Sequence, residues 1–295
     1  MSTSQIEQRA SHRGASKSDE QRGPVSRGFS WVPLIVALSA LGALCLGWRI
    51  YQQVWAFSTG LDSHGPDFNK YWLTLAGANM LLLPTAAAAV FAWTWVSAKR
   101  LPKELTREDE GRRLWTLWVL VAMFCATVFA GGSYFAEEDA TWHQILTRDT
   151  AFTPSHDVLF YGVFPLMIYM AAGIYLYART RLPHIYGGKA LPVSFTLIVA
   201  GSALLFFQVA MNEFGHSFFQ AEEVFSAPLH WPFVIFGYLL AATFAIWFET
   251  LPRIFELARQ ERELAAAATS SDKPAHVATA AAEPATAQRE SEVLH

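Results

Sequence analysis

The sequence predicts an all-α integral membrane protein with about six transmembrane helices, and three observations support this class. Hydrophobic residues make up 53% of the 295 residues and charged residues only 16%, a balance more typical of a membrane protein than of a large soluble core. Six segments with few charged residues reach the roughly 20 mostly apolar residues that a bilayer-crossing helix needs. These segments lack the apolar/polar alternation that is typical of β-barrel strands.

The six expected helices follow one another along the chain with polar connections between them. They cover about 31–51, 71–98, 113–135, 157–178, 191–211 and 231–250. The first segment is too long and too far from the N-terminus for a secretory signal, and no small-residue cleavage site follows it before the next helix. We therefore expect it to be a transmembrane helix.

The composition divides the chain into three parts. Residues 1–28 are polar and without periodicity, so we expect a disordered tail. Residues 29–258 form the transmembrane helical domain, with outward-facing segments that could bind a metal. Residues 259–295 are charged and Ala-rich, and we expect the last helix to fray there into a largely disordered tail. Function should therefore lie in the range 29–258.

The positions of basic residues predict the orientation in the membrane. Nineteen of the 22 Lys and Arg residues lie in the two tails and in the second and fourth connections. The other three are Arg49, Lys70 and Arg148. Because cytoplasmic loops carry the excess of Lys and Arg, both termini should be cytoplasmic, which requires an even number of helices. The first, third and fifth connections then face outward.

The third connection contains a candidate metal-ligand set, Asp139, His143 and His156. Asp139 and His143 are four residues apart, so both side chains project from one face if the third helix continues through them. In "FTPSHD", Thr153 is a candidate N-cap and Pro154 suits the first helical position, which places His156 in the first turn of the fourth helix. A carboxylate with two imidazoles is a common ligand set for copper, zinc or non-haem iron.

The fifth connection repeats this pattern with an amide in place of the carboxylate. Asn212 and His216 are four residues apart, and His230 follows fourteen residues later at the start of the sixth helix. The simpler interpretation is that these histidines only hydrogen-bond neighbouring carboxylates. Ionisable groups at membrane depth are costly and usually mark function, so spacing alone predicts an outward-facing metal or proton site. Five glutamates are candidates for orienting ligands or relaying protons, or only for packing: Glu137, Glu138, Glu213, Glu222 and Glu223.

Two stretches carry a resemblance to a known family. "EEDATWHQILTRDTAFTPSH" and "NEFGHSFFQAEEVFSAPLHWPFV" resemble the signature stretches of the C subunit of the copper membrane monooxygenases, which oxidise methane, ammonia or short-chain hydrocarbons. The resemblance covers about residues 48–255. It implies a helical membrane subunit that assembles with A and B subunits, in a trimer of heterotrimers, in a bacterial cytoplasmic membrane with its metal segments on the outer side.

The resemblance also implies the site residues. Asp139, His143 and His156 match one family metal site, and Asn212, His216 and His230 match a second copper site. One position departs from the pattern: family members often read NEWGH, and here Phe214 replaces the tryptophan. Phenylalanine lacks the indole N–H, so a hydrogen bond beside the ligands can differ.

The function implied is hydroxylation of a small substrate with O₂, using copper, with zinc as a possibility at Asp139, His143 and His156 and quinol as a possible electron donor. We expect the reaction centre at Asn212, His216 and His230. Methane or a short alkane is favoured over ammonia, because of Phe214 and the long Ala-rich tail. Apolar pockets discriminate poorly between molecules that differ by a methylene, so this preference is slight.

Two other classes of protein remain as alternatives. The chain could be a non-catalytic scaffold subunit with a structural metal site. It could also be a haem b or quinone-linked oxidoreductase subunit, which needs histidines deep within facing helices. The candidate histidines cluster at outward helix ends instead, which argues against a haem site.

Overall fold

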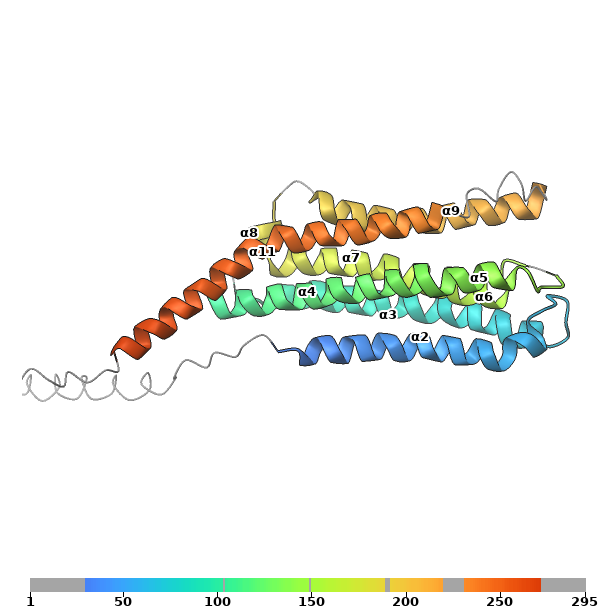
Figure 1. The fold of residues 1–295 in the computed structure, drawn as a ribbon, viewed down its shortest axis with the longest axis horizontal. Helices are drawn as coiled ribbons and strands as arrows, with labels where there is room; N and C mark the ends of the chain where they lie inside the picture. The colour runs from blue at the N-terminus through green and yellow to red at the C-terminus, as the bar shows by residue number, and fades with distance from the viewer. Residues whose placement is uncertain (1–29, 103, 149, 189–191, 220–230, 272–295) are drawn as a thin grey trace, which may run out of the picture. The chain divides into compact units, whose positions relative to one another are not determined.

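The computed structural model describes residues 30–102, 104–148, 150–188, 192–219 and 231–271 (Figure 1). Side chains are described in these ranges except at 206, 208–219, 231–234 and 271. Regular structure in these ranges is helical, and one isolated β-bridge joins Asp62 and Arg148. Five helical spans are long and apolar enough to cross a membrane, and a shorter apolar stretch covers Val193–Leu205. The all-α membrane class is confirmed.

The helices follow the expected order but extend beyond the apolar segments. Their bounds are α2 Val32–Thr59, η1 Asn69–Leu73, α3 Thr74–Ala98, α4 Arg107–Phe129, η2 Ala130–Phe135, α5 Ala136–Trp142, α6 Pro154–Val158, η3 Leu159–Val163, α7 Phe164–Arg181, α8 Pro183–Tyr186, α9 Val193–Phe219 and α11 Trp231–Ser271. Hydropathy locates only the part of a helix that matches the bilayer core. Polar residues at the ends continue the same backbone hydrogen-bond ladder.

The start of α4 shows such a polar end. Thr106 has an extended backbone, and its side chain accepts a hydrogen bond from the backbone N–H of Asp109. Glu108, Asp109 and Glu110 fill the first turn, where negative charge is favourable against the helix dipole. The helix therefore begins at Arg107, ahead of the apolar run at 113–135.

Three of the spans contain a π-helical turn. η1 leads into α3, η2 joins α4 to α5, and η3 joins α6 to α7. Such turns are rare and occur frequently at functional sites. Both η2 and η3 directly adjoin the short helices α5 and α6, which carry the candidate ligands of the third connection.

Helix α7 packs against α3, α4 and α9, and it is the centre of the bundle. Glycines allow close approach elsewhere: a Cβ on Gly132 would lie 2.9 Å from the Phe236 ring, and one on Gly201 would lie 2.7 Å from Leu239. Small residues at such contacts are typical of membrane helix packing. Phe236 and Leu239 belong to α11, so these contacts pack α11 against η2 and α9.

The helices differ in how much of their surface is covered. In the most apolar stretch of each span, only 11% of the residues are buried in α2 and in η1–α3, compared with 44% in α4–α5 and 50% in α6–α7. Large apolar side chains are exposed on the first two spans, among them Ile35, Phe57, Leu81 and Trp93. These surfaces suit contact with lipid or with other membrane helices.

A buried polar network joins the helices at the end of the bundle where α4 begins and α7 ends. Glu110 is 5% exposed and accepts hydrogen bonds from Arg253 Nε and Nη2, both at 2.7 Å. His184 Nε2 lies 2.8 Å from the same carboxylate. Arg181 donates to the carbonyl of Thr94 at 2.6 Å. α4, α8 and α11 thus meet at one carboxylate, and Arg181 links α7 to α3.

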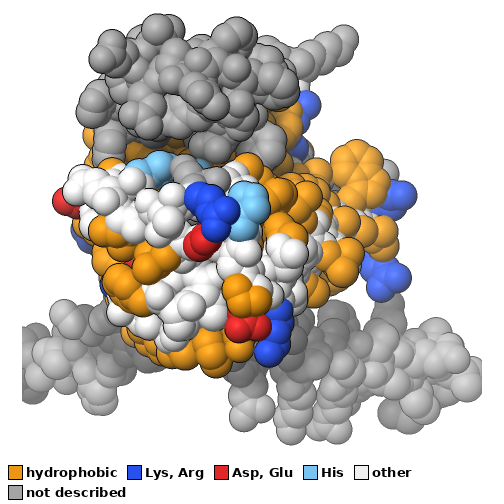
Figure 2. Space-filling model, turned by 90° about the vertical axis from the view of Figure 1, so that its right-hand side faces the viewer, with side chains coloured by type: hydrophobic (Ala, Val, Ile, Leu, Met, Phe, Trp, Pro, Cys, Tyr) orange, Lys and Arg blue, Asp and Glu red, His pale blue; other side chains and the backbone are white. Residues whose placement is uncertain are grey.

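At the other end, the first and third connections are joined. The N–H of Thr147 donates to the carbonyl of Leu61 at 2.8 Å, and Arg148 Nη2 lies 2.5 Å from Asp62 Oδ2. The arginine holds the pKa of the Asp62 carboxyl below its usual range, chiefly through this hydrogen bond. Figure 2 looks at this end and shows acidic, basic and histidine side chains gathered on it, with hydrophobic side chains along the border.

The chain divides into two compact units, one of residues 27–255 and one of residues 1–26 and 256–295. In the second unit, the described residues continue α11 to Ser271, with a hydrogen bond between Gln260 and Glu256 and an ion pair between Arg259 and Glu263. This helix lies within the range expected to fray. The expected disorder of residues 1–28 and 272–295 falls outside the described residues.

Candidate metal centre

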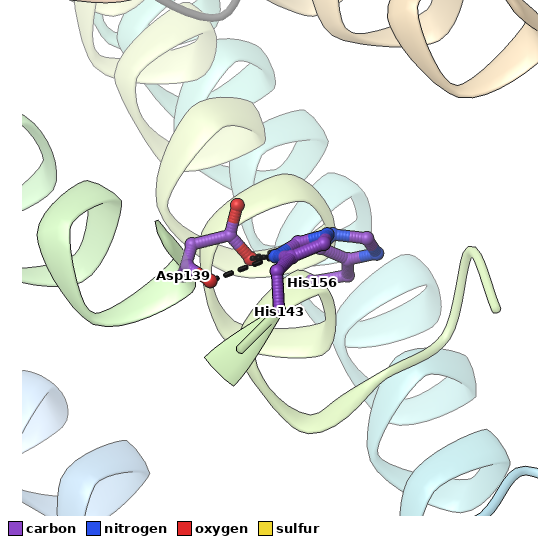
Figure 3. A group of neighbouring side chains, drawn as sticks. All are labelled: Asp139, His143 and His156. Atoms are coloured by element: carbon purple, nitrogen blue, oxygen red, sulfur yellow. Dashed lines mark hydrogen bonds and ion pairs between the residues drawn. The ribbon is translucent and has the colours of Figure 1, made fainter. Parts of the chain in front are cut away.

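Asp139, His143 and His156 lie together at the end of the bundle (Figure 3). Asp139 is on α5, His143 is its C-cap, and His156 is in the first turn of α6. One ligand atom from each residue lies within 4.8 Å of the others. Asp139 Oδ1 is 3.3 Å from His156 Nε2 and 3.9 Å from His143 Nδ1. The spacing-based prediction that these three residues converge is confirmed.

Local sequence explains these positions. Pro154 occupies the start of α6, as predicted, and Thr153 precedes it with an extended backbone. The Thr153 side chain does not cap this helix, because its buried hydroxyl makes no hydrogen bond with the described residues. The backbone carbonyl of Thr153 instead accepts the N–H of Asp157 at 3.0 Å. The helix start was predicted correctly, and the side-chain cap was wrong.

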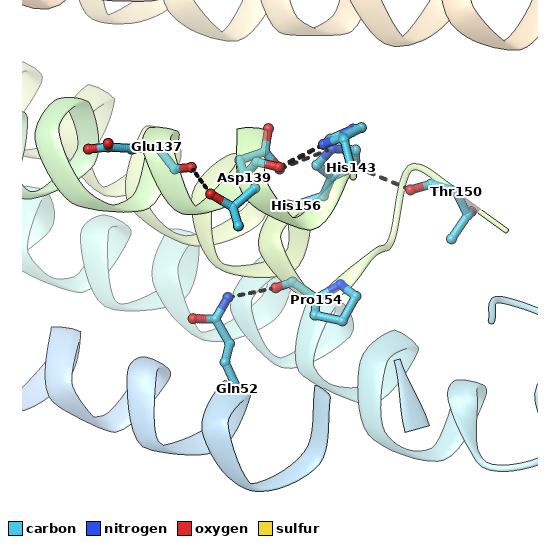
Figure 4. Close-up of polar contacts among 8 residues, drawn as sticks. Gln52, Glu137, Asp139, His143, Thr150, Pro154 and His156 are labelled. Atoms are coloured by element: carbon cyan, nitrogen blue, oxygen red, sulfur yellow. Dashed lines mark hydrogen bonds and ion pairs between the residues drawn. The ribbon is translucent and has the colours of Figure 1, made fainter. Parts of the chain in front are cut away.

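Backbone carbonyls set the orientation of both imidazoles. His156 Nδ1 lies 3.1 Å from the carbonyl of Thr150, and His143 Nδ1 lies 2.8 Å from the carbonyl of Asp139 (Figure 4). A carbonyl oxygen only accepts, so each Nδ1 carries the proton and donates it. In neutral His156, Nε2 then keeps its lone pair beside Asp139 Oδ1, which is the arrangement that metal-binding histidines usually have. In His143 the nitrogen near Asp139 Oδ1 is the protonated Nδ1, so this residue would bind a metal through its other nitrogen, Nε2.

The site is buried on one side and open on the other. His156 is 0% exposed and Asp139 is 9% exposed, whereas the side chain of His143 is 31% exposed. The His156 ring stacks on Phe160 with ring centroids 4.4 Å apart, which restricts its rotation. Asp139 Oδ1 is buried and accepts no hydrogen bond from the described residues. A buried carboxylate is costly without a compensating charge, so this oxygen fits a cation.

The donor set fits a divalent transition metal. One carboxylate oxygen and two imidazole nitrogens suit copper, zinc or iron, and three protein ligands leave a coordination position for another molecule. A closed structural zinc site normally has four protein ligands. The described residues therefore resemble an open metal site more than a closed one.

The two glutamates beside Asp139 do not join the cluster. Glu138 makes an ion pair with Arg49, whose guanidinium lies 5.6 Å from the centre of the Tyr134 ring. Glu137 is exposed and lines the surface pockets beside α5. Arg49 thus neutralises the charge of one acidic group next to the cluster.

The second candidate set falls largely outside the described structure. Asn212, Glu213 and His216 lie on α9, but their side chains are outside the described residues. The other members lie outside them entirely: Glu222, Glu223 and His230. The described residues therefore leave this set untested.

An apolar pocket of about 560 Å³ lies between the η2 region and α11. Val128, Phe129, Phe236 and Leu240 provide its apolar walls, and Gly132 leaves room for it. Glu137, two residues before Asp139, lies on its rim. This pocket could hold a small apolar molecule near the start of α5.

Sequence reasoning missed Gln52 and Asn79. Both are buried amides, 1% and 7% exposed; Asn79 lies within the apolar run 71–98, and Gln52 directly follows the run at 31–51. They donate to backbone carbonyls of α6, at Pro154 and Asp157. For Asn79 the available signal was an uncharged amide inside an apolar run, since such a group needs a polar partner there. Gln52 follows an apolar run beside other polar residues, so it carried no such signal.

The fold and site define a polytopic α-helical membrane protein with a cluster of three candidate metal ligands at one end of its bundle. The family model for the C subunit of ammonia monooxygenase/methane monooxygenase matches residues 15–261, and the chain belongs to this family. A search of curated proteins finds no match. The chain is therefore a member of a family of membrane monooxygenase subunits, as the two signature stretches indicated.

Proposed function

We propose that this chain is the C subunit of a copper-dependent membrane monooxygenase that hydroxylates a small substrate with O₂. The observation that carries the proposal is the convergence of Asp139, His143 and His156 in a member of this family. Methane or a short-chain alkane is the favoured substrate and ammonia the next. The apolar pocket beside η2 supports a small, weakly polar substrate.

Copper is the proposed metal, with zinc as the alternative at Asp139, His143 and His156. Copper would supply the redox chemistry with O₂ that protein side chains lack. The chain's own residues hold the ligands in place: the carbonyls of Thr150 and Asp139 fix the imidazoles, and Phe160 excludes water from one face of His156. We retain Asn212, His216 and His230 as the proposed reaction centre.

The proposed assembly contains A and B subunits, arranged as a trimer of heterotrimers, in a bacterial cytoplasmic membrane. The exposed apolar surfaces of α2 and α3 could contact such subunits or lipid. Arg113 on α4, Arg181 on α7 and Arg253 on α11 lie at the end opposite the cluster, which supports an outward-facing metal centre by the distribution of Lys and Arg. Quinol is a proposed electron donor.

The test compares metal content, copper EPR and substrate oxidation in the purified complex. His156→Ala should lose one metal per heterotrimer and its EPR signal, and His64→Ala, which alters an exposed loop histidine, should keep both. Asn212→Ala/His216→Ala should abolish oxidation of methane, propane or ammonia. Unchanged metal content in His156→Ala would reject the site. Full oxidation in both variants after loss of metal would favour the scaffold alternative.

A further inference from the structure

Two amide side chains from neighbouring helices hold the backbone of α6. Gln52 on α2 donates from Nε2 to the carbonyl of Pro154 at 3.1 Å (Figure 4). Asn79 on α3 donates from Nδ2 to the carbonyl of Asp157 at 2.9 Å. These two carbonyls lie on either side of His156 in the sequence. The short helix that carries this ligand is therefore fixed from two directions.

The location of these hydrogen bonds has a physical reason. α6 ends at Val158 and η3 begins at Leu159, so the backbone hydrogen-bond register changes beside Asp157. A carbonyl oxygen has two lone pairs, so it can accept a further hydrogen bond from a side chain outside its own helix. α6 is buried along its whole length. Amides from α2 and α3 can provide the donors.

The orientation of the Asn79 amide is itself set by a third residue. Trp48 Nε1 donates to Asn79 Oδ1 at 3.4 Å, so the Nδ2 end of the amide faces Asp157. The indole is 6% exposed and packs on η3, where a Cβ on Gly162 would lie 3.0 Å from the ring. A chain of two hydrogen bonds thus runs from α2 through α3 to α6.

Gln52 uses only its donor end. Its Oε1 is buried and accepts no hydrogen bond from the described residues. An unsatisfied buried acceptor is unfavourable, so this side chain adds little stability beyond its one donated hydrogen bond. A role in placing the Pro154 carbonyl explains a glutamine here better than a role in stability alone.

We propose that Gln52 and Asn79 are positioning residues of the metal centre. By holding the backbone before and after His156, they keep its Nε2 at 3.3 Å from Asp139 Oδ1. This inference rests on metal binding at Asp139, His143 and His156, and it is independent of which substrate is oxidised. Residues that orient ligands typically change metal affinity by about 10–100-fold when they are replaced.

The test titrates Cu²⁺ into the metal-depleted complex and follows EPR, with the site's signal defined as the one that His156→Ala removes. Gln52→Met and Asn79→Leu keep the approximate shape of each side chain and remove the donor. Each should weaken Cu²⁺ binding at this signal by about tenfold and shift the spectrum. For Gln52→Met the unfolding temperature should change little, because the substitution removes the unsatisfied Oε1 together with the donating Nε2.

Thr127→Val is the matched control, because it removes a buried hydroxyl that donates to the carbonyl of Met123 in α4, away from the cluster. It should leave Cu²⁺ affinity and spectrum unchanged. Trp48→Phe is a milder variant that keeps a ring against Gly162 and removes the indole N–H, and it should shift the spectrum by less than Asn79→Leu.

Wild-type affinity and spectrum in Gln52→Met, Asn79→Leu and Trp48→Phe would overturn the inference while leaving the metal site intact. A signal that persists in His156→Ala would instead reject the metal site at these residues. The same loss of Cu²⁺ affinity in Thr127→Val would mean that general destabilisation explains the weaker binding of the other variants. That result would also overturn the inference.

Discussion

Replacing Gly60 with alanine would place a methyl group in space that Pro154 already fills. Gly60 ends α2 with φ −112°, a conformation open to alanine, so the effect comes from packing alone. The new Cβ would lie 2.4 Å from Pro154 Cγ, whereas carbon atoms pack at about 3.5–4.0 Å. The proline ring is rigid, so α6 or the end of α2 must move by about 1 Å. Overpacking of this kind costs about 1–3 kcal/mol.

The displaced residue is two positions before His156, so the prediction joins stability to metal binding. Gly60→Ala should lower the apparent unfolding temperature by about 2–12 °C and reduce retention of Cu²⁺ after washing with a chelator. Gly42→Ala is the control on the same helix, because nothing lies within 4 Å of its new Cβ. It should be neutral or more stable by up to about 1 kcal/mol. Circular dichroism melts and metal analysis of the complex measure both effects.

The reasoning fails if Gly60→Ala has the same unfolding temperature as Gly42→Ala and retains the same amount of copper. A lower melting temperature with full copper retention would mean that α2 yields rather than α6. That outcome would refute the prediction that a methyl group at Gly60 displaces the candidate metal ligand His156. The predicted loss of stability from overpacking would still be correct.

Three further predictions concern other parts of the chain. Glu110→Gln should destabilise the protein by about 1–3 kcal/mol in a thermal melt, because it weakens charge-assisted hydrogen bonds to a part-buried arginine, whereas Asp109→Asn in an exposed pair should cost less than about 1 kcal/mol. The lowered pKa of Asp62 means that its ion pair is complete above the usual aspartate pKa and is lost as pH falls through the lowered value. Proteolysis of the joined loops should rise over that interval, and Arg148→Gln should remove the pH dependence. Chelation should lower the unfolding temperature of the wild type more than that of His156→Ala.

The helical class and the order of the spans could be predicted because hydrophobicity and length are properties of contiguous sequence. The ends of the helices could not be predicted as well. α2 continues to Thr59, past the apolar run at 31–51, because the polar residues there still complete the backbone ladder and find partners across the bundle. Gln52 is one of them, and its partner on α6 is remote in sequence.

The ligand cluster was predictable for a different reason. A separation of four residues places Asp139 and His143 on one helical face, and proline marks the start of the helix that carries His156. The pairing of Glu138 with Arg49 was not predictable, because the two residues lie on different helices and neither has a distinctive local pattern. Contacts between helices depend on packing, which a single sequence does not reveal.

The π-helical turns of the third and fourth spans change the rotational phase of each helix. The extra residue is absorbed within the turn, so a uniform α-helical wheel misplaces every residue beyond it by about 100° about the helix axis. A helical wheel drawn with uniform spacing from Val128 would therefore assign Asp139 to the wrong side of its helix. The same holds for a wheel drawn back from Met167 to His156. Deleting one residue from either turn should therefore let that turn become α-helical while the ligand beyond it keeps its present face.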